Sequence, residues 1–206
     1  MKRLLLGLLA LTVVAGGGFL ALTTFASGPA VARWAPCPRN WAWIPAWQPR
    51  PSPLRDVRFT AAGGHGRVCY GAPSLRGRTM IGGAAVPFGQ LWRTGANEPT
   101  TLHTEVPLTL GGVALEPGSY AIYTVPGAES WNVVVNRSTR QWGLESEYTD
   151  AVARQELGRF AVIPETLTTP VEQMRIVAEP AGVETDLLLE WQTTRIRIPL
   201  RRAGLR

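Results

Sequence analysis

The sequence predicts an all-β domain, a β-sandwich or a barrel-like antiparallel fold, preceded by one N-terminal apolar helix. Three observations support this prediction. Apolar and polar residues alternate along many short segments, Gly and Pro separate these segments, and the 206 residues leave room for one domain and little more. Many short strands with frequent turns are typical of sandwiches and barrels, and 45% hydrophobic residues suffice for a core.

The β-type alternation continues almost to the C-terminus. In the segment 130–136, for example, Trp131, Val133 and Val135 would point to one face of a sheet. Residues 144–158 are the one stretch that fits a short helix. We expect strands over residues 56–61, 66–72, 100–105, 106–110, 113–115, 119–125, 130–136, 159–163, 171–179, 185–191 and 194–200.

Residues 1–32 have the composition of an export signal. The chain begins MKR and then runs from Leu4 to Ala26 without a charged residue, which is long enough to cross a bilayer as a helix. Basic residues before such a run direct the following chain outward. The run is either a signal anchor or a signal peptide cleaved near Ala30–Ala32. We therefore expect an exported, periplasmic or extracytoplasmic domain, with the membrane as a partner if the segment stays uncleaved.

Residues 33–55 are rich in Trp and Pro and predict an extended tether in front of a single domain over residues 56–206. Its indole rings would lie either at a membrane interface or against the domain, as a covering strap. The rings belong to Trp34, Trp41, Trp43 and Trp47.

Cys37 and Cys69 are the two cysteines of the chain. In an exported protein they predict a disulfide, which would pin the tether to the domain. The alternative is that Cys69 is a small buried side chain of a strand and Cys37 an incidental thiol.

The net charge of +6 is concentrated before the domain. Residues 1–58 hold 7 basic residues and 1 acidic residue, whereas residues 59–206 hold 14 of each. A nucleic-acid-binding domain would carry the positive charge itself, so we expect no nucleic-acid partner. The two histidines lie far apart in the sequence, and no phosphate-loop or dinucleotide motif is present, so we expect no metal and no cofactor.

The segment PFGQLWRTGANEPTTLHTE concentrates the residues with the most chemistry. Arg93 and Glu98 could form an ion pair in a partly buried loop, with Asn97 fixing the turn, or they could line a binding site. His103 belongs to the predicted polar face of a strand, and we expect its side chain to face solvent.

Several strings of the sequence together resemble one bacterial family, the domain-of-unknown-function 2911 family, over about residues 56–200. The strings are YGAPSLRGRTMIGG, FGQLWRTGANE, LEPGSYAIYTVPG, WNVVVN, QWG and LEWQTTRIRIPL. The resemblance implies an exported all-β domain, often with a signal sequence, and no established activity. The chain departs from the family pattern at Pro99, where a small residue such as Ala is more usual.

The resemblance also implies a set of motif positions, from which three functions can be ranked. First is an envelope module that binds a small polar or sugar-like ligand or a protein partner. Second is a structural or assembly domain, and third is a hydrolase that uses Glu98 and His103. The motif positions are Ser74, Gly77, Arg78, Trp92, Arg93, Thr94, Gly95, Asn97, Glu98, Gln141 and Trp142. The candidate binding residues are Arg78, Trp92, Arg93, Asn97, Glu98, His103 and Trp142.

Overall fold

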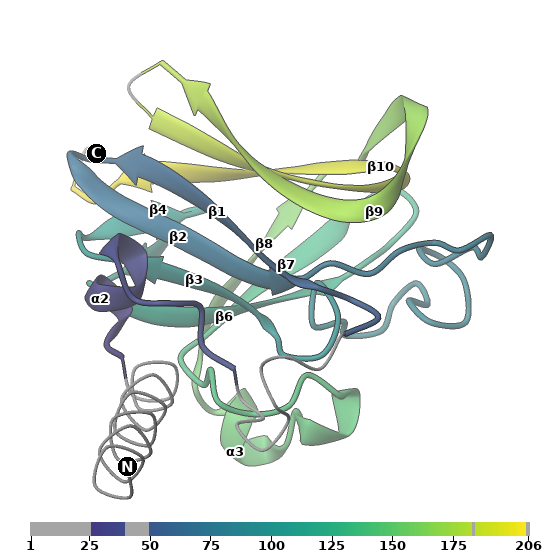
Figure 1. Ribbon diagram of the computed structural model, residues 1–206, viewed down its shortest axis with the longest axis horizontal. Coiled ribbons are helices and arrows are strands. Elements are labelled where there is room, and N and C mark those ends of the chain that lie inside the picture. The colour runs from purple at the N-terminus through teal and green to yellow at the C-terminus, as the bar shows by residue number, and fades with distance from the viewer. Residues whose placement is uncertain (1–25, 40–49, 183, 205–206) are drawn as a thin grey trace, which may run out of the picture.

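Two antiparallel sheets pack face to face (Figure 1), which confirms the predicted all-β class. The computed structural model describes residues 26–39, 50–182 and 184–204. One sheet has six strands in the order β1-β2-β3-β6-β7-β8, and the other has four in the order β5-β4-β10-β9. The strands are β1 (Leu54–Ala61), β2 (Gly64–Gly71), β3 (Thr100–Thr104), β4 (Leu108–Leu110), β5 (Val113–Leu115), β6 (Gly118–Val125), β7 (Trp131–Asn136), β8 (Glu156–Val162), β9 (Glu165–Ala181) and β10 (Glu184–Arg202).

The predicted strands correspond closely to the observed ones except near the C-terminus. The two strands expected over 185–191 and 194–200 form one long strand, β10. Its pairing with β9 shifts register on both sides of Gln192, whose φ is +57°. An irregularity of this kind bends a strand without ending it. The polar residues around Gln192 resemble a turn in the sequence. The pairing with β9, which continues on both sides of Gln192, shows that the segment is a single strand.

Helical structure is limited to short segments in the described part of the chain. Within the stretch 144–158, α3 (Asp150–Ala153) follows a 3₁₀ turn at Glu145–Glu147, in agreement with the predicted short helix. Near the N-terminus, α2 (Gly28–Arg33) is a six-residue helix with Ser27 as its N-cap.

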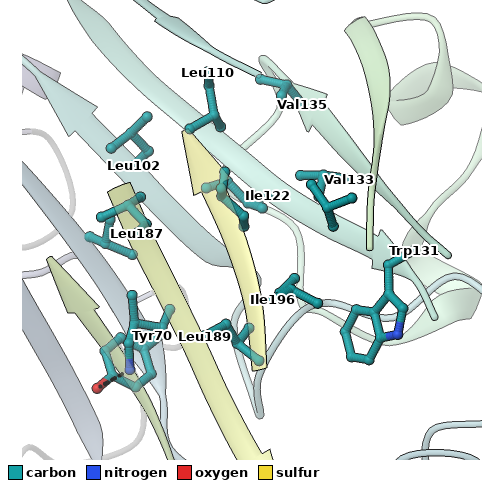
Figure 2. Close-up of a cluster of buried hydrophobic side chains, with 14 of the residues drawn as sticks. Tyr70, Leu102, Leu110, Ile122, Trp131, Val133, Val135, Leu187, Leu189 and Ile196 are labelled. Atoms are coloured by element: carbon teal, nitrogen blue, oxygen red, sulfur yellow. Dashed lines mark hydrogen bonds between the residues drawn. The ribbon is translucent and has the colours of Figure 1, made fainter. Parts of the chain in front are cut away.

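The hydrophobic core fills the space between the two sheets (Figure 2). Trp131, Val133 and Val135 of β7 all face this core, as the alternation predicts. From the opposite sheet, β10 contributes Leu187 and Leu189, which are also almost fully buried. The inner faces of both sheets are thus apolar, and polar side chains are left to the outer faces.

The N-terminal segment covers part of the outer face of the six-stranded sheet, over β2, β3 and β6. We call residues 26–39, which include α2, the strap. Figure 1 shows α2 in front of β2 and β3. Val31 and Ala35 of the strap are fully buried there, and the Arg67 guanidinium of β2 donates hydrogen bonds to both of their carbonyl oxygens, at 3.4 and 2.6 Å. A Cβ atom on Gly28 would lie 2.1 Å from the Gly118 carbonyl carbon, so this close approach requires glycine.

A disulfide fixes the end of the strap. Cys37 and Cys69 are bonded, with their Cα atoms 5.8 Å apart, as the two-cysteine count predicts. Of the four tether tryptophans, Trp34 has 61% of its surface exposed. Trp41, Trp43 and Trp47 lie outside the described residues.

The predicted apolar helix also lies outside the described residues, apart from Ala26. None of the helices that the structure describes is long and apolar enough to cross a membrane. Residues 28–32, which the sequence assigns to the end of the leader, pack on the sheet as part of the strap.

The outer face of the four-stranded sheet carries paired charges. Glu190 is almost fully buried and accepts hydrogen bonds of 2.6 Å from Arg175 and from Arg195. Asp186 is bound in the same way by Arg197 and Arg201. Burial raises the pKa of Glu190, but the two arginine hydrogen bonds outweigh burial, so this pKa lies below its usual value. Each buried carboxylate on this face is therefore held ionised by two guanidinium groups.

Candidate functional site: a polar cavity under the strap

The WRTGANE loop is fixed by its own backbone and by the core. The indole of Trp92 is buried and stacks on Trp191, with ring centroids 5.8 Å apart. Thr94 and Asn97 adopt positive φ values of +58° and +67°, which turn the chain sharply. The Thr100 hydroxyl closes the loop by donating to the Thr94 carbonyl oxygen at 2.7 Å. The loop is therefore a rigid turn that leads directly into β3.

Glu98 at the end of this loop forms a buried ion pair with Arg50. One guanidinium nitrogen, Nη2, donates to both carboxylate oxygens, at 2.8 and 2.9 Å. The side chains of Arg50 and Glu98 are only 10% and 6% exposed. The other terminal nitrogen of Arg50, Nη1, is buried without a hydrogen-bond partner among the described residues.

The prediction that Glu98 pairs with Arg93 is therefore wrong, because the partner of Glu98 is Arg50. Arg93 instead donates to the Asn97 carbonyl oxygen at 3.2 Å, and the Asn97 amide donates to the Ser52 carbonyl oxygen, also at 3.2 Å. The local spacing suggested a pair within the loop. The fold brings Arg50, which is 48 positions away in the sequence, to the carboxylate instead.

A cavity of about 200 Å³ lies between the strap and the outer face of the six-stranded sheet. Ala26 and Pro38 of the strap line one side, and Thr101, His103 and Ser119 of β3 and β6 line the other. The full lining consists of Ala26, Pro38, Leu54, Cys69, Tyr70, Gly71, Glu98, Pro99, Thr101, His103, Ser119, Thr139 and Arg140. The cavity thus joins the disulfide, the end of the WRTGANE loop and the polar face of β3.

His103 is in the middle of the polar wall of this cavity. Its Nε2 atom lies 3.0 Å from the Thr101 hydroxyl, and its Nδ1 atom lies 2.8 Å from the Ser119 hydroxyl. Burial is the main cause that lowers the pKa of His103 to about 3, and the nearby positive charge of Arg67 adds to this effect. The imidazole is therefore neutral at physiological pH.

The expectation that His103 faces solvent is wrong, since only 1% of its surface is exposed. The alternation correctly places it on the outer face of β3. That face is buried because the strap covers it, and the pattern within β3 carries no information about a segment more than 60 positions away.

The seven candidate binding residues do not form one site. Glu98 and His103 line the cavity. Arg78 is exposed on another loop and donates to the carbonyl oxygens of Leu75 and Ser74, and Trp92 belongs to the core. Arg93 and Asn97, within the WRTGANE loop, and Trp142 are half-buried, and none of the three lines the cavity.

Sequence reasoning missed Thr101, Ser119 and Arg140 as cavity residues. Thr101 and His103 alternate on one face of β3, and Ser119 is the cross-strand partner of His103. These residues could have been grouped only from the pairing register between β3 and β6, and a single sequence does not show this register.

Residues 52–200 match the model of a protein family whose description is "Protein of unknown function (DUF2911)". The chain belongs to the DUF2911 family. Searches of curated proteins and of solved structures found no match. The DUF2911 assignment carries no activity with it, so any function has to be argued from the geometry of the cavity.

We predict that loss of the Arg50 guanidinium destabilises the protein. Arg50→Ala leaves the buried Glu98 carboxylate unpaired, at a cost of about 3–5 kcal/mol. The thermal midpoint should fall by about 6–20 °C for a chain of this size. Thermal unfolding followed by circular dichroism measures the effect. Arg78→Ala, which removes an exposed guanidinium, is the matched control and should leave the midpoint nearly unchanged. An unchanged midpoint in Arg50→Ala would contradict the buried pair.

We further predict that His103 makes stability depend on pH. In the unfolded chain, histidine takes up a proton near its ordinary pKa of about 6.5. In the folded chain, the pKa of His103 is lowered to about 3. Its contribution is therefore present in full above about pH 6.5 and is lost as the pH falls toward 3. Between pH 6.5 and 5 the free energy of unfolding should drop by about 1.5 kcal/mol from this group.

Denaturant titrations of His103→Asn at both pH values test this dependence, because asparagine keeps hydrogen-bonding groups but does not titrate. The variant should lose less stability between the two pH values than the unmodified chain. His65→Asn, which changes the exposed histidine, should keep the original dependence. Equal pH dependence in His103→Asn and the unmodified chain would mean that His103 is not the responsible group.

Proposed function

We propose that this DUF2911 protein is a binding module that holds a small, hydroxyl-rich or sugar-like ligand in the cavity under the strap. One observation carries the proposal: the cavity is lined by polar side chains whose hydrogen-bonding capacity is not used up by the fold. The Thr101 and Ser119 hydroxyls each contact His103 and have no other hydrogen-bond partner among the described residues. Polar groups that converge on a cavity are typical of ligand sites.

The size of the cavity supports a small ligand. A volume of about 200 Å³ corresponds to about seven water molecules at about 30 Å³ each. This volume is below the range of about 300–1,000 Å³ of sites for drug-sized molecules. A compound with few carbon atoms fits this space better than a peptide or an oligosaccharide does.

The charges favour a binding module over the hydrolase hypothesis. A general base has to accept a proton, but His103 is buried and lies near the positive charge of Arg67, which disfavours the imidazolium. Glu98 is bound by Arg50 through both carboxylate oxygens. His103 is thus held neutral, and both carboxylate oxygens of Glu98 are already occupied by the Arg50 guanidinium.

A structural role is the second candidate, and the Arg50–Glu98 pair favours it. This pair connects the segment before β1 to the WRTGANE loop. The hydrogen bond from the Asn97 side-chain amide to the Ser52 carbonyl oxygen is a second connection between them. Most of the family motif in this chain then serves to place the loop. The two roles are compatible, because a cavity wall needs a rigid support.

We also propose that the domain acts outside the cytoplasm. The uncharged run after MKR supports export. The Cys37–Cys69 disulfide agrees with an oxidising compartment and adds weaker support.

Ligand binding in the cavity should raise the thermal midpoint of the full-length chain. A ligand at about 100 times its Kd stabilises a protein by about 2.7 kcal/mol, or about 5–11 °C here. A thermal-shift screen with polyols, monosaccharides and small organic acids measures this rise. Ala26→Leu fills the cavity from the strap, and Ser119→Val removes a hydroxyl from the sheet side. Both variants should lose the rise.

The matched control is Ala84→Leu, which enlarges an exposed alanine on another loop and should keep the full rise. A rise that persists in both cavity variants would place the ligand elsewhere. No rise with any compound of the screen would favour the structural role.

The location is tested by fusing alkaline phosphatase after residue 60 in a bacterial host. Alkaline phosphatase is active only where its disulfides form, so we expect an active fusion. An inactive fusion, together with an active cytoplasmic reporter at the same position, would show that the domain is not exported.

A further inference from the structure

We propose that His103, together with Thr101 and Ser119, selects a neutral polyol over charged small molecules of the same size. The inference rests on the proposed function and names the ligand class of the same cavity. Its basis is a count of the protons and lone pairs that the three side chains leave for a ligand.

A neutral imidazole has one ring nitrogen that donates and one that accepts. His103 has a hydroxyl at each ring nitrogen, Thr101 at Nε2 and Ser119 at Nδ1. One hydroxyl must therefore give its proton to the ring, while the other accepts a proton from the ring. The first is left with two free lone pairs, and the second is left with a free proton and one lone pair. Whichever tautomer is present, the pair offers a ligand one donor, on one of the two hydroxyls, and free lone pairs on both.

The remaining proton and lone pairs of the Thr101 and Ser119 hydroxyls are not engaged by the described part of the chain. Neither the Thr101 nor the Ser119 hydroxyl has a further hydrogen-bond partner there. Thr101 is buried and Ser119 is half-buried, and both line the cavity. Buried polar groups are normally satisfied, so a ligand or water has to supply the missing donor and acceptor.

Hydroxyl groups match this arrangement better than ionised groups do. A hydroxyl both donates and accepts and rotates to suit its partner. A carboxylate only accepts, so it would leave the lone pairs of the first hydroxyl without a donor. An ammonium only donates, so it would leave the free proton of the second hydroxyl without an acceptor.

The electrostatics of the cavity wall point the same way. The charge of the Glu98 carboxylate is balanced by Arg50, and His103 is neutral. Arg140, which also lines the cavity, is not free of partners. An ion that entered this part of the cavity would lose hydration without gaining an unpaired counter-charge from these residues.

Three compounds with a four-carbon chain test the selection. They are erythritol, with hydroxyl groups, succinate, with carboxylates, and 1,4-diaminobutane, with ammonium groups. Each is titrated into the full-length chain while the imidazole signals are followed by two-dimensional ¹H–¹⁵N NMR. The chain has two histidines, and the exposed His65 is an internal control. We expect erythritol to shift the His103 signals and to bind at least about tenfold more tightly than either ion.

Variants identify the groups that select. Thr101→Val and Ser119→Ala each remove one hydroxyl and should weaken erythritol binding about tenfold or more. Thr101→Ser keeps a hydroxyl at the same position and should restore most of the affinity. Ser130→Ala, at an exposed serine, should change nothing.

Tighter binding of succinate or diaminobutane than of erythritol, with the His103 signals shifted, would overturn the selection and leave the ligand site of the proposed function standing. Equal binding of erythritol to Thr101→Val, Ser119→Ala and the unmodified chain would also overturn it. If none of the three compounds shifts the His103 signals, the inference fails, and the separate thermal-shift screen decides the proposed function.

Discussion

The attachment of the strap to the six-stranded sheet is the contact on which the candidate site depends. A disulfide to Cys69 and hydrogen bonds from Arg67 hold the strap, and both residues belong to the outer face of β2. A sheet of this kind commonly leaves one face to solvent. Here the covered face carries His103 and the hydroxyls beside it. The strap therefore buries part of a polar surface and leaves a cavity beside it.

Closing that surface changes the chemistry of the groups beneath it. Burial makes the imidazole of His103 neutral, and a neutral imidazole exchanges donor and acceptor roles with its two neighbours. Burial also requires a partner for the Glu98 carboxylate, which Arg50 supplies. Beside His103 the cavity wall thus combines hydroxyls, a neutral imidazole and a paired carboxylate, the arrangement on which the proposed binding of a neutral ligand rests.

The family motif has two roles in one short loop. Its first half belongs to the core, where Trp92 stacks on Trp191. Its second half reaches the cavity through Glu98. Packing of the first half fixes the position of the second, because a buried indole between two sheets has little freedom to move. The same short motif therefore contributes both to the core and to the wall of the candidate site.

The sequence alone determined the all-β class, most strand positions, the inner face of β7 and the disulfide. These features follow from local alternation, from turn residues and from having two cysteines, and all three are visible in a linear chain. The single long β10, the Arg50–Glu98 pair and the burial of His103 were decided by the tertiary structure. Each depends on which distant segment covers or pairs with a residue, and the periodicity of a single strand contains no information about its partners.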